Sequence, residues 1–103
     1  MGYKIDIAPA ASQDLDEIIT YITKELENPT AAASFLDEVE TCCGRLEKMP
    51  FMFEECRDPR LKSLGYRRAV IKHYVMVYRV DKAKNIVYIL RFFYGAREYE
   101  KLI

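Results

Sequence analysis

The chain has 103 residues, of which 50% are hydrophobic and 31% charged, and this composition is typical of a folded globular domain rather than a disordered segment. The formal net charge is zero, but residues 1–55 carry four basic against twelve acidic residues, and residues 56–103 carry twelve basic against four acidic. The basic half indicates an acidic or polyanionic partner, unless acidic helices simply lie beside a basic sheet in one neutral domain. The length predicts one domain over residues 1–103.

The first half of the chain predicts one strand followed by two helices. Residues 3–8 alternate in polarity, which predicts a short strand that buries Tyr3, Ile5 and Ile7. Pro9 suits a first helical turn. The apolar stripe of the first helix then comprises Leu15, Ile18, Ile19, Ile22 and Leu26.

A second helix is predicted to begin at Asn28-Pro29, because asparagine is a favourable cap and proline a favourable first helical residue. Met49-Pro50 ends it. Its apolar stripe comprises Ala32, Phe35, Leu36, Val39, Cys42, Cys43 and Leu46. The short connection between the two helices predicts an antiparallel helical hairpin.

The second half of the chain predicts a sheet. Residues 49–64 show no period and contain two prolines, so they are interpreted as a loop. Strands are predicted over 66–72, 74–81 and 86–94, with short connections that make an antiparallel meander. The first strand has to join this sheet. The order β-α-α-β-β-β therefore predicts a two-layer α+β fold with the helical hairpin on one face and the other face open.

Neither a metal site nor a cofactor is expected. The three cysteines, at positions 42, 43 and 56, are an odd number with an adjacent pair, and there is one histidine. This pattern favours free, buried thiols over a disulfide framework or a zinc site. No apolar run approaches the roughly 18 residues that span a bilayer, and the N-terminus lacks a signal-peptide core, so no membrane contact and a cytoplasmic location are expected.

The ordered elements and several short strings resemble the RelE/ParE family of toxins from type II toxin–antitoxin pairs. The resemblance is carried by residues 14–22, 46–50, 65–68, 74–81 and 89–97. It implies a growth-inhibiting toxin that a cognate antitoxin neutralises. RelE-like members cut messenger RNA on the ribosome and are enzymes, whereas ParE-like members poison DNA gyrase and are not known as nucleases. The oligomeric state stays open.

For the nuclease branch, the resemblance implies catalytic roles for Arg97, Arg67 and Tyr94. RNA cleavage by 2′-OH attack needs a base, an acid and stabilisation of the charge on phosphorus. Tyr94 stands where a few family nucleases have a histidine, and a phenol is a poor base at neutral pH. Where a lysine and an arginine are expected, this chain has Ala69 and Val75. These two replacements favour the ParE-like branch.

Target or nucleic-acid contacts are predicted at Arg67, Arg79, Arg91, Arg97 and Tyr99. Guanidinium groups bind phosphate and carboxylate in bidentate fashion. The alternatives for these arginines are a solvated sheet surface or ion pairs with the antitoxin. A third reading of the whole chain is a non-toxic binding domain that retains the fold, because fold does not fix function.

The remaining aromatic side chains and the single histidine are given structural roles. Tyr66, Tyr74, Tyr78 and Tyr88 are interpreted as packing residues rather than platforms for base stacking. His73 is interpreted as an exposed turn residue, because no nucleophile motif accompanies it.

Overall fold

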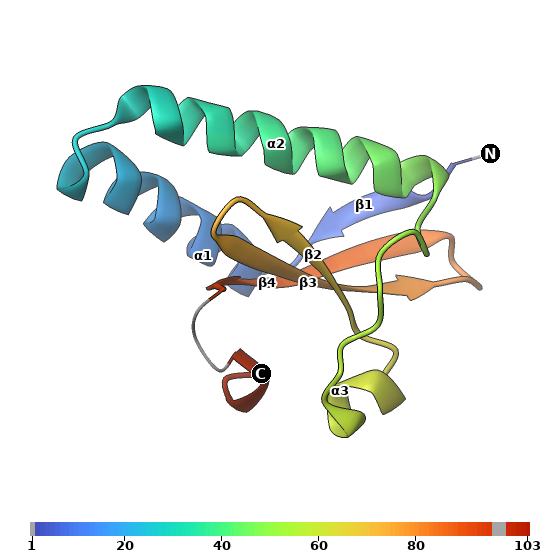
Figure 1. Ribbon diagram of the computed structural model, residues 1–103. Helices are drawn as coiled ribbons and strands as arrows, with labels where there is room; N and C mark the ends of the chain where they lie inside the picture. The colour runs from blue at the N-terminus through green and yellow to red at the C-terminus, as the bar shows by residue number, and fades with distance from the viewer. Residues whose placement is uncertain (1, 96–98) are drawn as a thin grey trace.

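The computed structural model describes residues 2–95 and 99–103 (Figure 1). Its elements are β1 (Lys4–Ile7), α1 (Pro9–Thr20), a π-helical turn (Tyr21–Glu25), α2 (Pro29–Lys48), α3 (Pro59–Ser63), β2 (Arg67–Ile71), β3 (Tyr74–Asp81), β4 (Ile86–Tyr94) and a 3₁₀ turn (Tyr99–Lys101). The sheet order is β1-β4-β3-β2, with β1 parallel to β4 and the other pairs antiparallel. The predicted α+β fold, with an antiparallel meander joined by the N-terminal strand, is confirmed.

The helical layer forms as its capping residues predict. Pro9 occupies the first turn of α1, and the Asn28 side chain accepts a hydrogen bond from the backbone N–H of Ala31 at the start of α2 (3.0 Å). The two helices lie as a hairpin on one face of the sheet (Figure 1). In the described part of the chain, no helix has the length and apolarity that a membrane crossing requires.

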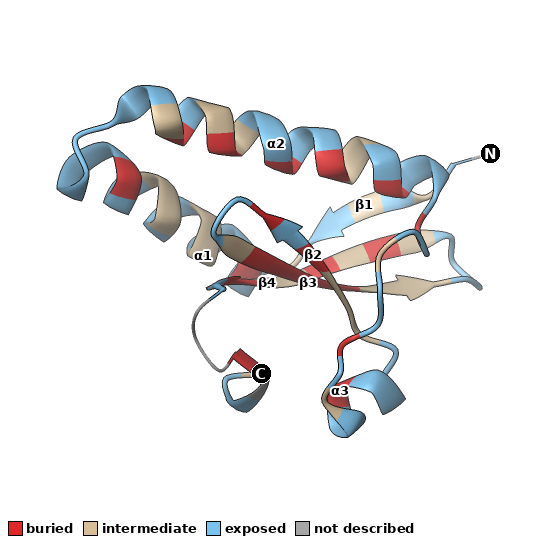
Figure 2. Ribbon diagram, viewed as in Figure 1, coloured by how far each residue is buried: buried red, intermediate tan, exposed pale blue. Residues whose placement is uncertain are grey.

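The first core lies between this hairpin and the sheet. Phe35 and Leu46 of α2 are buried against Tyr78 of β3 and Ile89 of β4. Figure 2 shows the buried positions of α2 on its sheet-facing side. The predicted stripe of the second helix is confirmed, because each of its residues is buried or partly buried.

The predicted burial of two apolar residues is wrong. Leu26 is 56% exposed because the first helix continues as a π turn, in which the Leu26 N–H reaches back five residues to the carbonyl of Tyr21 (3.2 Å). Because the π turn has more residues per turn than an α-helix, Leu26 no longer lies on the same side of the helix as the buried Ile22. Ile7 is 41% exposed, at the end of an edge strand.

The prediction that the other face of the sheet is open is also wrong, because a second core covers that face. Leu61 of α3 and Tyr99 of the 3₁₀ turn are buried there against Val77 and Phe93. The predicted loop over 49–64 therefore contains a helix. Asp58 caps this helix by accepting the N–H groups of Arg60 and Leu61 (2.9 and 3.2 Å). Five residues with one buried apolar side chain are too few to show a helical period.

None of the three cysteines forms a disulfide, as predicted, and Cys42 and Cys56 are buried while Cys43 is half-buried. Burial, and then the neighbouring Cys42, raise the pKa of Cys43 to about 11. This thiol is therefore protonated and unreactive at neutral pH.

Candidate functional site

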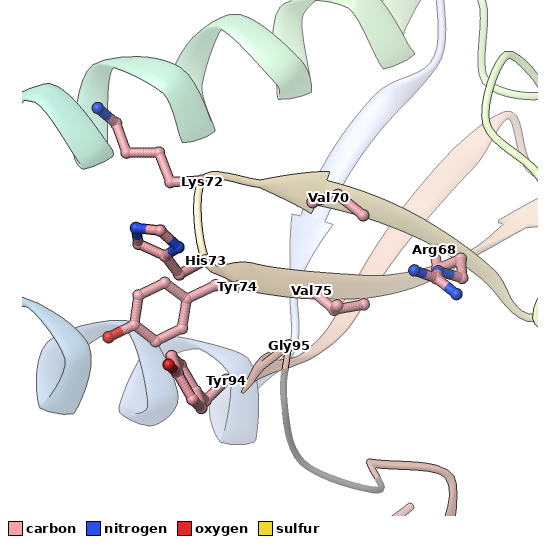
Figure 3. Close-up of a pocket in the computed structure, with 8 residues that line it drawn as sticks. All are labelled: Arg68, Val70, Lys72, His73, Tyr74, Val75, Tyr94 and Gly95. Atoms are coloured by element: carbon pink, nitrogen blue, oxygen red, sulfur yellow. The ribbon is translucent and has the colours of Figure 1, made fainter.

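A groove of ≈ 280 Å³ lies where the β2–β3 hairpin turns beside the end of β4. It is lined by Arg68, Val70, Lys72, His73, Tyr74, Val75, Tyr94 and Gly95 (Figure 3). Lys72 and His73 form the two-residue turn, and the figure shows Arg68 at the far end of the groove beyond Val70 and Val75.

The backbone of the groove is tightly fixed. Lys72 has a φ of 54°, the left-handed conformation that a tight hairpin turn requires. The Gly95 N–H donates to the carbonyl of His73 (2.7 Å) and so ties the end of β4 to this turn. A Cβ at position 95 would lie 3.1 Å from the same carbonyl oxygen, so glycine permits this close approach.

The groove suits an anionic group. Its basic lining residues are Arg68, Lys72 and His73, and among the lining residues that the structure describes none is acidic. Arg68 Nε is buried without a hydrogen-bond partner among the described residues, and it lies 3.9 Å from Glu54 Oε1. Lys72 Nζ lies 4.0 Å from Glu38 Oε1, a long and exposed pairing. A carboxylate or phosphate entering the groove would be attracted by the Arg68 and Lys72 charges, and a guanidinium binds either anion in bidentate fashion.

Tyrosines form the other wall. The rings of Tyr74 and Tyr94 meet edge to face, with centroids 5.8 Å apart, and Tyr74 packs on Phe35 of α2 at 5.1 Å. Burial, and then the nearby Tyr21 and Tyr94, raise the pKa of Tyr74. Tyr74 is therefore a neutral phenol at neutral pH, able to donate a hydrogen bond but unsuited to act as a base.

None of the predicted basic residues that the structure describes lines this groove. Arg67 pairs with Tyr78 on the side of the first core, and its Nη1 donates to the carbonyl of Phe53 (2.7 Å). Arg79 lies over the ring of Tyr88, with Cζ 4.5 Å from the centroid. Arg97 lies outside the described residues.

Arg91 is held by α1. Its Nε and Nη2 donate to the two carboxylate oxygens of Asp14 (2.6 and 3.1 Å), and this contact raises the pKa of Arg91. Asp14 also accepts the backbone N–H of Phe92 (3.0 Å). The pairing of β1 with β4 ends at Ile89. Beyond it the Phe92 N–H has no neighbouring strand on this edge, and Asp14 accepts its hydrogen bond instead. Arg91 thus has a structural partner within the chain.

The two aromatic residues of the predicted site differ in access. Tyr94 lines the groove and is 50% exposed. Tyr99 is 4% exposed and stacks on Phe93 at a centroid distance of 5.8 Å. The Tyr99 ring is therefore part of the second core and does not present a surface to a target in this conformation.

The strand register also separates Ala69 from Val75. Ala69 pairs with Met76 in the first core, whereas Val75 pairs with Val70 beside the groove. The groove positions on β2 are thus Arg68 and Val70, neither of which belongs to the predicted site. The alternation could have indicated them, because apolar Ala69 and Ile71 mark the buried face of this strand.

Residues 5–99 match the family model of the ParE toxin of the type II toxin–antitoxin system parDE. This match covers most of the chain, which therefore belongs to the ParE toxin family of type II toxin–antitoxin systems. No curated protein matches the chain.

Two solved complexes contain a chain of similar structure. One is the RelBE2 toxin–antitoxin complex of Mycobacterium tuberculosis, with 23% identity, a TM-score of 0.64, and coverage of 91% of this chain and 99% of that chain. The other is the chromosomal ParDE system of P. aeruginosa, with 18% identity, a TM-score of 0.67, and coverage of 87% and 92%. At these identities the likeness shows the fold, and it confirms the predicted RelE/ParE-type architecture.

Proposed function

We propose that this chain acts in the cytoplasm as a ParE-like toxin that poisons DNA gyrase and carries no nuclease activity. The observation that carries the proposal is the make-up of the groove. Apolar Val70 and Val75 stand side by side within it, and Val75 takes the place where the resemblance leads us to expect a catalytic arginine. The described groove residues also include no group suited to act as a base, apart from the turn residue His73.

A cognate antitoxin is proposed as the neutralising partner. Both solved relatives are toxin–antitoxin complexes, and the basic second half of this chain favours an acidic binding segment. An amphipathic segment that orders on binding would suit such a surface.

The proposal is tested with purified protein in two assays. We expect the chain to inhibit supercoiling of a relaxed plasmid by gyrase, and the product of the adjacent gene to relieve the inhibition. Ribosomes translating a defined message should leave that message intact in its presence. Ribosome-dependent cuts with gyrase unaffected would overturn the proposal.

A ribosome-dependent nuclease is the second candidate, and the Arg68 guanidinium at the groove favours it as a phosphate ligand. If cleavage occurs, Arg97→Ala should lower its rate by about 10²–10³, the typical effect of losing one donor to transition-state charge. Normal bacterial growth despite accumulation of the folded protein would favour a non-toxic binding domain over both candidates.

A further inference from the structure

The turn after α2 gathers exposed apolar side chains. Met49, Phe51 and Met52 are 56%, 42% and 39% exposed, although they lie within four consecutive residues. Single exposed apolar residues are common on protein surfaces, whereas a group of large ones is typical of a binding surface. Methionine and phenylalanine are also enriched in protein interfaces.

This turn is held in place from beneath. The Tyr78 hydroxyl donates to the buried carbonyl of Pro50 (3.0 Å), and Arg67 Nη1 donates to the carbonyl of Phe53 (2.7 Å). The Met52 N–H donates to the carbonyl of Met49 (3.2 Å). The exposed side chains thus stand on an ordered backbone, so a partner would lose little free energy in ordering them.

Two cations flank the central ring. Arg67 Cζ lies 5.0 Å and Lys82 Nζ 5.4 Å from the centroid of Phe51. Within the described residues neither cation forms an ion pair, since the salt bridges there involve Arg68, Lys72 and Arg91. A partner that fits this surface has apolar side chains beside carboxylates.

We propose that Met49, Phe51 and Met52, together with Arg67 and Lys82, form the docking surface for an acidic, amphipathic segment of the antitoxin. This inference rests on the proposed function. It places the antitoxin contact away from the groove, because the neighbouring residues Arg67 and Arg68 pair with Tyr78 and Val77 and so point to opposite faces of β2. Neutralisation and toxicity should therefore be separable by substitution.

The experiment compares Phe51→Ser and Lys82→Glu with two controls matched in exposure and chemistry. Leu64→Ser removes an exposed apolar side chain of 53% exposure at the end of α3, and Lys84→Glu reverses an exposed cation in the same β3–β4 turn. The probe is the purified product of the adjacent gene. Its Kd, the salt dependence of its association rate and the rescue of growth on co-expression are measured, with circular dichroism to verify each fold.

We expect Phe51→Ser to raise Kd about 30-fold or more, as for an interface hot spot. Lys82→Glu should slow association and weaken its dependence on salt, since exposed charges mainly steer encounter. Both variants should arrest growth even with the antitoxin co-expressed, and the controls should be rescued like the wild type.

Three results would overturn the inference. The first is that a folded Phe51→Ser variant binds the antitoxin with unchanged Kd. The second is that both variants lose toxicity, which would make the surface a contact for the target. The third is that the controls weaken binding equally. A wild-type chain that is not toxic would instead contradict the proposed function, while an affinity loss confined to the Phe51 and Lys82 variants would still support the docking surface.

Discussion

At the scale of single residues, Tyr78 links the centre of the sheet to the turn that follows α2. Its ring is fully buried, and its hydroxyl donates to the Pro50 carbonyl. Burial raises its pKa to about 12, although the nearby Arg67 charge opposes the shift. The phenol thus stays neutral in the folded protein at a pH where an unfolded chain, with a tyrosine pKa near 10, ionises.

This shift predicts a pH-dependent effect of Tyr78→Phe. At pH 8 the variant should lose about 1–3 kcal/mol of unfolding free energy, because the Pro50 carbonyl is left buried and unpaired. Between pH 10 and 12 the unfolded wild type binds fewer protons than the folded one, so the contribution of Tyr78 falls by about 1.4 kcal/mol per pH unit. Urea unfolding should show a smaller difference in unfolding free energy between the wild type and the variant at pH 11 than at pH 8. A gap independent of pH would contradict the buried, neutral phenol.

At the scale of elements, α3 makes the second face of the sheet part of the fold. Leu61 is fully buried there, whereas Leu64, one turn later, is 53% exposed. Leu61→Ala should lower the unfolding free energy by about 2–5 kcal/mol through lost burial and a residual cavity. Leu64→Ala should change it by less than about 0.5 kcal/mol. Urea unfolding of both variants measures the contrast, and equal small effects would mean that α3 adds little to stability.

The sequence predicted the elements that are long enough to show a clear pattern of apolar residues. β3 and β4 begin and end at the predicted residues, and the stripe of α2 is buried as expected. The covering of the second face escaped prediction because α3 has five residues and its packing depends on long-range contacts. Likewise, the sequence could not show that Arg91 is paired with Asp14, or that Arg67 donates to the Phe53 carbonyl while forming no ion pair among the described residues.

At the scale of the whole molecule, the charge asymmetry of the sequence becomes an asymmetry between layers. The helical segments α1, the π turn and α2 carry eight carboxylates against three cations, and residues 67–94 carry seven cations against one carboxylate. The acidic helical layer beside a basic sheet, one of the two readings of the sequence, is therefore observed. The resulting field favours the approach of acidic partners to the sheet side and weakens as salt rises.

Two surfaces on opposite faces of the basic sheet lead to the last prediction. Arg68→Gln removes a charge from the groove, and the one ion pair of Arg68 among the described residues, with the 59% exposed Glu54, contributes at most about 1 kcal/mol to stability. If the groove contacts the target, inhibition of gyrase should weaken by tenfold or more, the typical effect of losing a hydrogen bond to a charged group. Antitoxin binding should change less than about twofold, because the proposed docking surface lies on the opposite face.

The matched control is Arg79→Gln, which removes an equal charge from a residue that lies over Tyr88, outside the groove. The concentration for half-inhibition of supercoiling and the Kd for the antitoxin are measured for both variants. A general effect of net charge would weaken the inhibition of gyrase by both variants equally. Weaker antitoxin binding by Arg68→Gln, with gyrase inhibition unchanged, would instead assign the groove to the antitoxin, because the two surfaces would then serve one partner.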